Sequence, residues 1–188
     1  MRCTVLTKAL LGIALAAITF TAGAAVPESK DPIKIAVLDW SSQIVQSHIT
    51  GDLLSKLGYN VKYIPANDQL QFTALGTGDL DVEMEVWEQT NKENFNKELK
   101  TGRIIDAGEH AAKTRVEWWY PDYVAKQCPG LPSWKALNKC AKIFATPETA
   151  PKGRYLAGPV DWKMGDNARV KALGMNFTVI NAGQAAAL

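Results

Sequence analysis

The sequence predicts an α/β protein built on a parallel sheet, and three observations support this. Short apolar runs rich in β-branched residues, of which IKIAVL (33–38) is the clearest, are typical of strands buried on both faces. These runs alternate with stretches that have helical periodicity. Glycines such as Gly58 stand where those helices are expected to end. The alternation predicts right-handed βαβ units.

The elements before residue 110 follow this alternation in order. After the strand at 33–38, apolar residues recur at helical spacing over 44–57 and predict a helix with one apolar face, on or near which His48 packs. The further expected elements are a strand at 60–64, a helix at 68–75, a strand at 80–86, a helix at 89–100 and a strand at 103–108.

The run LDVEMEV (80–86) alternates apolar and acidic residues, as a strand with two different faces does. Its acidic residues are Asp81, Glu83 and Glu85. We expect a solvated or ligand-facing surface here rather than a metal cluster.

The character of the sequence changes near residue 110, where we place a boundary between a first lobe (25–110) and a second, partial lobe (111–188). The aromatic run EWWYPDYV opens the second part, and PETAPKGRYLAGP within it is expected to be loop. Its expected elements are a helix at 133–144 capped by Ser133, a helix at 166–174 and a strand at 176–181.

Residues 1–24 have the pattern of a secretory signal peptide: two basic residues, an apolar run and an Ala-Gly-Ala cleavage site. The apolar run is too short to cross a bilayer comfortably, so we expect an exported protein, periplasmic in a Gram-negative cell. Without Arg2 and Lys8 the basic and acidic residues balance, which argues against nucleic acid or an anionic membrane as a partner.

The last residues, NAGQAAAL (181–188), begin a helix that has room for only one turn. Because helix nucleation is the costly step, a single turn gains little stability. We therefore expect this sequence to be a fragment of a longer protein, with a frayed terminus as the alternative.

Cys128 and Cys140 are the two cysteines outside the expected signal peptide. In an exported protein we expect them to form one structural disulfide, which would contribute about 3 kcal/mol by loop-closure entropy. Neither His48 nor His110 has ligand spacing to them, so no metal site is expected.

The sequence contains few features that indicate catalysis. The chain has no phosphate-binding loop, dinucleotide fingerprint or nucleophile elbow, and neither histidine has a Ser/His/Asp context. We expect no enzyme activity and no cofactor.

Trp40 and Trp87 follow two of the predicted strands. Ligands of open α/β sheets bind outside the carboxyl ends of the strands, and the electron-rich face of tryptophan attracts cations. The pair therefore predicts part of an aromatic cage for a quaternary ammonium compound, which has no N–H to donate; the alternative is that both simply pack. Asp39 could add attraction or cap the next helix, and we expect structural roles for Trp134 and Trp162.

Three segments together resemble the substrate-binding proteins of ABC importers for glycine betaine, choline and related osmolytes. They are DWSSQIVQSHITGDLLSKLGYNV, GDLDVEMEVW and KTRVEWWYPDYV. The resemblance extends over nearly all of residues 33–188. It implies a two-lobed type II periplasmic-binding-protein fold that closes on its ligand, a role in osmoprotection, and a permease and ATPase complex as the partner, with membrane association only through that permease.

By motif, Trp40 and Trp87 match two walls of the family's aromatic box, and Tyr123 matches a tyrosine from the second lobe. Trp119 is a neighbouring candidate for that position. Ser41 and Ser42 are our own candidates for donors to a ligand carboxylate at a helix N-terminus. Family members continue well past residue 188 and supply a further aromatic residue there, which puts a complete box in doubt.

Several alternatives stay open at this point. The same fold could bind another small solute such as an amino acid, through an ionic anchor rather than a cage. The chain could be an inactive truncated fragment, or a two-lobed enzyme, against which the missing nucleophile–base pair argues. Nothing in the sequence separates glycine betaine from choline, carnitine or proline betaine.

Overall fold

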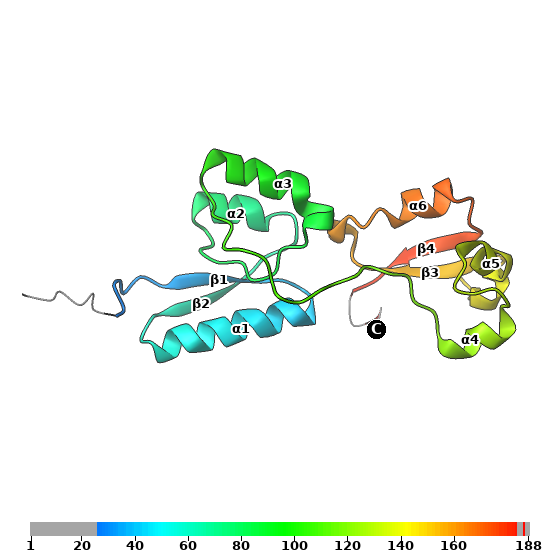
Figure 1. The fold of residues 1–188 in the computed structure, drawn as a ribbon, viewed down its shortest axis with the longest axis horizontal. Helices are drawn as coiled ribbons and strands as arrows, with labels where there is room; N and C mark the ends of the chain where they lie inside the picture. The colour runs from blue at the N-terminus through cyan, green and yellow to red at the C-terminus, as the bar shows by residue number, and fades with distance from the viewer. Residues whose placement is uncertain (1–25, 184–185, 187–188) are drawn as a thin grey trace, which may run out of the picture.

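A computed structural model describes residues 26–183 and 186, and its elements form two groups joined by residues 102–121 (Figure 1). The N-terminal group contains β1 (Ile33–Val37), α1 (Ser41–Lys56), β2 (Val61–Pro65), α2 (Gln71–Thr77) and α3 (Glu88–Thr101). The C-terminal group contains α4 (Asp122–Gln127), α5 (Trp134–Lys139), the 3-10 turn η1 (Ala141–Phe144), β3 (Gly153–Ala157), the 3-10 turn η2 (Val160–Trp162), α6 (Asp166–Ala172) and β4 (Phe177–Asn181). The expected signal peptide (1–24) and most of the expected final turn lie outside the described residues.

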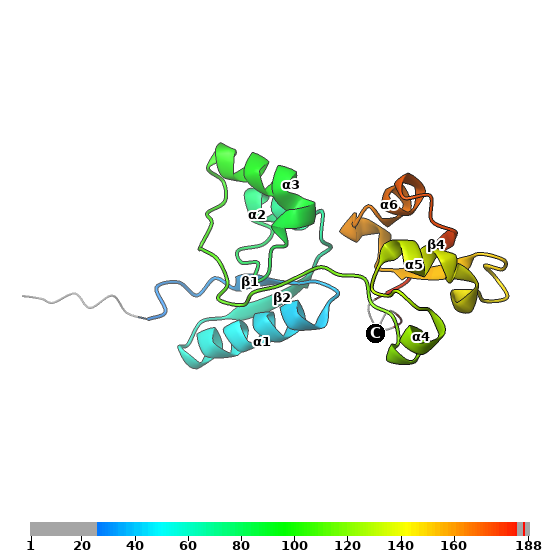
Figure 2. The ribbon, with the colours of Figure 1, turned by 45° about the vertical axis from the view of Figure 1, so that its right-hand side comes forward.

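Each group is built around a pair of parallel strands. β1 pairs with β2 from Ile33↔Val61 onward, and β3 pairs with β4 from Gly153↔Phe177 onward. Helices lie on both sides of the first pair, with α1 on one side and α2 and α3 on the other, and the second view shows the same arrangement (Figure 2). The predicted α/β class with parallel strand pairing is confirmed.

Helix α1 has the expected length, but the prediction of its buried face was wrong. The buried residues of α1 are Gln43, Ser47 and Gly51. The Gln43 Nε2 and Ser47 Oγ atoms donate to the carbonyl of Ala36 at 3.0 and 2.8 Å, and Leu38 N donates to Gln43 Oε1 at 2.8 Å. These polar side chains satisfy backbone groups that the two-stranded sheet leaves unpaired. The exposed stripe of α1 is apolar and consists of Val45, Ile49, Leu53 and Leu57.

Residues 80–86 do not form the predicted strand. Only Val82 pairs with β1, through a parallel bridge to Ile35 on the side away from β2. Of its acidic residues Asp81 is on a solvated face, whereas Glu83 and Glu85 are not: Glu85 is only 8% exposed and Glu83 is half-buried. Their carboxylates bond to α1 and to neighbouring backbone groups, and these bonds replace strand pairing.

Two further sequence predictions were wrong. The segment at 103–108 is not a strand; it is extended and solvent-exposed, with Ile105 90% exposed. The segment at 147–159, expected to be rich in loop, contains β3, and the aromatic run before it overlaps the first residues of α4.

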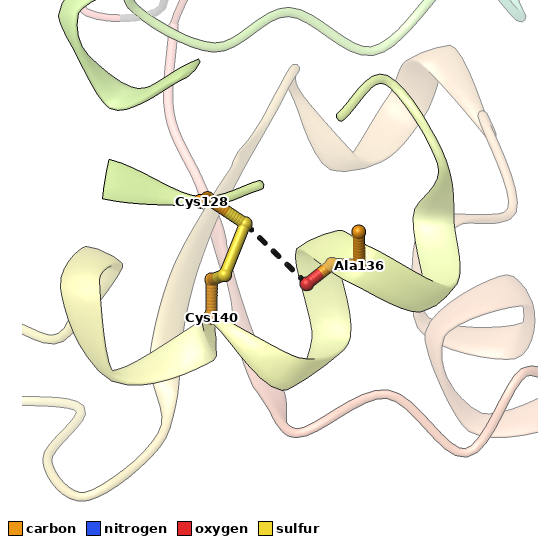
Figure 3. Close-up of a disulfide and its surroundings, with 3 residues drawn as sticks. All are labelled: Cys128, Ala136 and Cys140. Carbon is orange, nitrogen blue, oxygen red and sulfur yellow. Dashed lines mark hydrogen bonds between the residues drawn. A yellow bond between two sulfur atoms is a disulfide. The ribbon is translucent and has the colours of Figure 1, made fainter. Parts of the chain in front are cut away.

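The C-terminal group packs around a small core of Ala141, Val170, Met175 and Phe177. Cys128, at the end of α4, and Cys140, at the end of α5, are joined in a disulfide with a Cα–Cα distance of 5.9 Å (Figure 3). The Cys128 sulfur lies 3.4 Å from the carbonyl oxygen of Ala136. The bond therefore ties two short helices together on one side of the β3–β4 pair.

No helix within the described residues is both long enough and apolar enough to cross a membrane.

Candidate ligand-binding site

A cavity of about 320 Å³ lies where the two groups face one another. Its lining comes from the N-terminal group, from the joining segment and from η2 with the residues just after it. The lining residues are Trp40, Ser42, Asp68, Trp87, Gln89, Thr90, Arg115, Val116, Glu117, Trp119, Trp162 and Met164. Four of these are tryptophans, so indole rings dominate the apolar surface.

Trp40 and Trp87 are each the last extended residue before a helix. Trp40 follows β1 and is the N-cap residue of α1, and Trp87 is the N-cap residue of α3. Trp40 is buried and Trp87 is half-buried. The structure thus brings the two tryptophans predicted from strand ends to one cavity.

Glu85 bonds to both indole rings at their N–H edges. The Nε1 atoms of Trp40 and Trp87 each donate to Glu85 Oε1 at 2.8 Å. The hydroxyl of Ser42 donates to the same oxygen at 2.9 Å, and Gln46 Nε2 donates to Oε2 at 2.6 Å. Four donors therefore converge on one buried carboxylate, and we call this arrangement the Glu85 hub.

Trp162 brings a third indole from the C-terminal group. Its ring meets Trp40 edge to face, with a centroid distance of 5.8 Å and an interplanar angle of 86°. Its Nε1 donates to Asp39 Oδ1 at 3.0 Å, which links η2 to the end of β1. The predicted structural role for Trp162 thus coexists with a place in the cavity wall.

Of the other site residues proposed from the sequence, some line the cavity and others lie outside its lining. Ser42 lines the cavity, but its hydroxyl proton is engaged by Glu85. Ser41 is the first residue of α1 and is not part of the cavity lining. Trp119 lines the cavity and is 87% exposed. Tyr123, on α4, is 66% exposed and lies outside the lining.

Trp118, a neighbour of Trp119, packs instead on the C-terminal core. Its ring lies 5.3 Å from that of Tyr155. Of the two tryptophans in the aromatic run, Trp118 therefore packs on the core and Trp119 lines the cavity.

Asp68 is the buried acidic residue of the lining, at 3% exposure. Burial raises its pKa, and the charges of Asp161 and Asp39 add to the rise. Its carboxylate accepts from Asn91 Nδ2 at 2.8 Å, from Gln69 Nε2 at 2.9 Å and from Gln71 Nε2 at 3.2 Å. These bonds hold a negative charge next to the cavity while using most of its acceptor positions.

Arg115 and Glu117 lie at the exposed rim. Arg115 Nη1 is 3.3 Å from Glu117 Oε1, and both side chains are well exposed. Such a pair contributes little stability. Among the described residues that line the cavity, Arg115 supplies the one cationic group.

A wider hollow of about 840 Å³ runs between residues 81–89 and 103–116. Its lining contains Trp87, Phe72 and Phe95 but, among the described residues, no second tryptophan. Among the described residues there is no group of three or more His, Cys, Asp or Glu side chains placed to hold a metal ion.

Sequence reasoning missed several residues of this site, among them Glu85, Asp68, Arg115 and Trp162. Glu85 carried a usable signal, since it stands two positions before Trp87 in an alternating run. Asp68 and Trp162 carried none, because only tertiary packing brings their segments to the end of β1.

Comparison with known proteins gives two findings. Residues 31–188 match the family model described as the substrate-binding domain of the ABC-type glycine betaine transport system. The chain is also 40% identical, over 184 residues, to the trimethylamine N-oxide-binding protein of Pelagibacter ubique (strain HTCC1062). That match covers 94% of this chain and 58% of the relative, so the chain spans less than two thirds of the relative's length.

Proposed function

The chain belongs to the family of substrate-binding domains of ABC-type glycine betaine transport systems, and from this premise we propose that it binds a small solute with a trimethylammonium head in the tryptophan-lined cavity. It would do so outside the cytoplasm, and deliver the solute to an ABC permease and its ATPase.

Family membership also confirms two sequence predictions. The fold is the α/β periplasmic-binding-protein fold of this family. The family and the Pelagibacter relative are solute-binding proteins rather than enzymes. The boundary between the lobes at residue 110 and the signal peptide at 1–24 stay predictions.

The observation that carries the proposal is the meeting of four indoles, Trp40, Trp87, Trp119 and Trp162, around one small cavity. A desolvated cation over an aromatic face gains about 2 kcal/mol, and tryptophan is the best such face. Ligand cavities run from roughly 300 to 1,000 Å³, so a cavity of about 320 Å³ suits a small solute.

The state of Asp68 favours a head group without N–H donors. Its oxygens already accept three side-chain bonds. A primary ammonium would need free acceptors close by, whereas a trimethylammonium head needs only negative potential and apolar contact. Asp68 supplies the first and the indole rings supply the second.

The exposed rim of the cavity suits a ligand whose trimethylammonium head carries a short anionic tail. Arg115 is the cationic group of the lining and is well placed chemically to pair with an N-oxide or carboxylate oxygen. With the hydroxyl of Ser42 engaged by Glu85, we propose Arg115 as the tail donor ahead of the two serines. The name of the Pelagibacter relative makes trimethylamine N-oxide the first candidate ligand, followed by glycine betaine.

The test is a calorimetric titration of the purified chain with trimethylamine N-oxide, glycine betaine and choline, with tryptophan fluorescence as a second signal. We expect saturable binding of at least one. Trp87→Ala should abolish it, because the variant removes one wall and one donor to Glu85. Trp134→Ala is the matched control, since Trp134 lies on α5 outside the cavity lining.

Two results would contradict the proposal. One is a folded chain that binds none of the three solutes. The other is a Trp87→Ala variant with unchanged affinity.

A second candidate is a zwitterionic amino acid, because Asp68 and Arg115 line the same cavity with opposite charges. If the site binds an amino acid, proline or histidine should displace a bound amino acid from the cavity, and trimethylamine N-oxide should not. A competition titration separates the two candidates.

A further inference from the structure

Glu85, the centre of the Glu85 hub, is among the most heavily bonded side chains of the site. Its carboxylate is 8% exposed and accepts from two indoles, a serine and a glutamine. Within the described residues, no Lys, Arg or His forms an ion pair with it. A buried charge without an opposite charge is unfavourable, even when it is well hydrogen-bonded.

An indole has a single hydrogen-bond donor, so the partner of that donor fixes the direction of the ring. Trp40 and Trp87 come from different parts of the chain but direct their donors to one oxygen atom, each at 2.8 Å. The two walls are therefore positioned relative to one another through Glu85.

The same bonds place a negative charge at the edge of both rings. Because Glu85 is only 8% exposed, this charge acts on a nearby cation with less screening than it would in solution. It also polarises the two N–H bonds, because hydrogen bonds in a low dielectric strengthen one another. Both effects make the ring faces more attractive to a cation and leave their attraction for a neutral group of the same shape almost unchanged.

We propose that Glu85 is the positioning and charge-selecting residue of this site: it sets the two tryptophan walls and makes them prefer a cationic head to a neutral isostere. The inference rests on the proposed function and goes beyond it, since the aromatic walls alone would not require a carboxylate behind them. The bound cation is then the opposite charge that the buried carboxylate lacks.

The Glu85→Gln variant tests the effect of the negative charge separately from the effect of the hydrogen bonds that position the two indole rings. Glutamine keeps an oxygen for the two indole donors and removes the negative charge, while Gln46 can turn its amide to match. Glu85→Ala removes both the acceptor and the charge. Glu83→Gln is the matched control, because Glu83 stands two residues away and bonds to Gln43 and the backbone rather than to either indole.

The probes are trimethylamine N-oxide and its neutral carbon isostere, 2-methylpropan-2-ol, measured with the full chain by calorimetry and by displacement. We expect Glu85→Gln to weaken binding of the N-oxide by about tenfold, a factor within the range of cation–π energies, and to change binding of the alcohol far less. Glu85→Ala should lose more affinity than Glu85→Gln and should alter the near-UV circular dichroism of the tryptophans. Glu83→Gln should stay within about twofold of wild type, too small a change to matter energetically.

The outcomes are distinguishable. If the wild-type chain binds no trimethylammonium solute, the proposed function fails before Glu85 is tested. If wild type binds and Glu85→Gln keeps its affinity for the N-oxide, the inference is overturned. Equal weakening of the N-oxide and the alcohol would also overturn it, because a purely structural role predicts that result.

Discussion

Replacing Glu83 with glutamine should change how the stability of this protein depends on pH. Glu83 lies between Gln43 on α1 and the backbone N–H of Glu85, which donates to it at 2.8 Å. Burial raises the pKa of its carboxyl from 4.5 to about 7, and the charge of Glu85 adds to the rise while these hydrogen bonds oppose it.

The magnitude follows from linkage. One pKa unit corresponds to about 1.4 kcal/mol, so a rise from 4.5 to about 7 corresponds to about 3 kcal/mol. The folded state holds the proton more tightly than the unfolded state. The stabilising contribution is therefore fully present below pH 4.5 and is lost as the pH rises through about 7.

Glutamine resembles the protonated acid at every pH. We expect Glu83→Gln to match wild type at pH 4.5 and to exceed it by about 3 kcal/mol at pH 8 in urea unfolding followed by circular dichroism. Glu93→Gln, on the exposed face of α3, controls for the loss of one negative charge from the same group. A difference between Glu83→Gln and wild type that stays constant from pH 4.5 to pH 8 would refute the reasoning.

Two further predictions concern the C-terminal group. Gly153→Ala should destabilise the protein by about 1–3 kcal/mol in urea unfolding, because its Cβ would lie 2.6 Å from both the Ala141 carbonyl oxygen and the Phe177 ring; an unchanged midpoint would contradict this packing. The double variant Cys128→Ser, Cys140→Ser should lose about 3 kcal/mol, since the disulfide closes a loop with a sequence separation of 12. For the double variant the urea midpoint is the measurement, and a loss well below 1 kcal/mol would show that the loop is already ordered when reduced.

Local pattern was enough to predict some elements of this fold. The runs at 33–38 and 60–64 are short and contain β-branched residues. Strands β1 and β2 occupy these positions within a residue or two. The joint position of Trp40 and Trp87 was also predictable, since both follow segments that end at the same edge.

Other features of the fold depend on contacts with residues far away in the sequence, which a local pattern does not contain. Helical spacing in 44–57 predicted a helix but placed its apolar stripe inward, whereas the open edge of β1 draws the polar residues Gln43 and Ser47 to the sheet. Alternation in 80–86 predicted a strand, but Glu83 and Glu85 bond to α1 side chains and leave only Val82 paired. The place of Trp162 follows from its bond to Asp39, more than a hundred residues earlier in the chain.

One covalent path, residues 102–121, leads from the N-terminal group to the C-terminal group, and it contains no helix or strand. Contacts across the cavity, such as Trp162 with Asp39 and Trp40, therefore act as an intramolecular association whose strength depends on an effective concentration set by that tether. A solute that touches both sides adds to this association. Its affinity and the distance between a pair of dyes placed on α3 and α6 should then change together across a series of solutes.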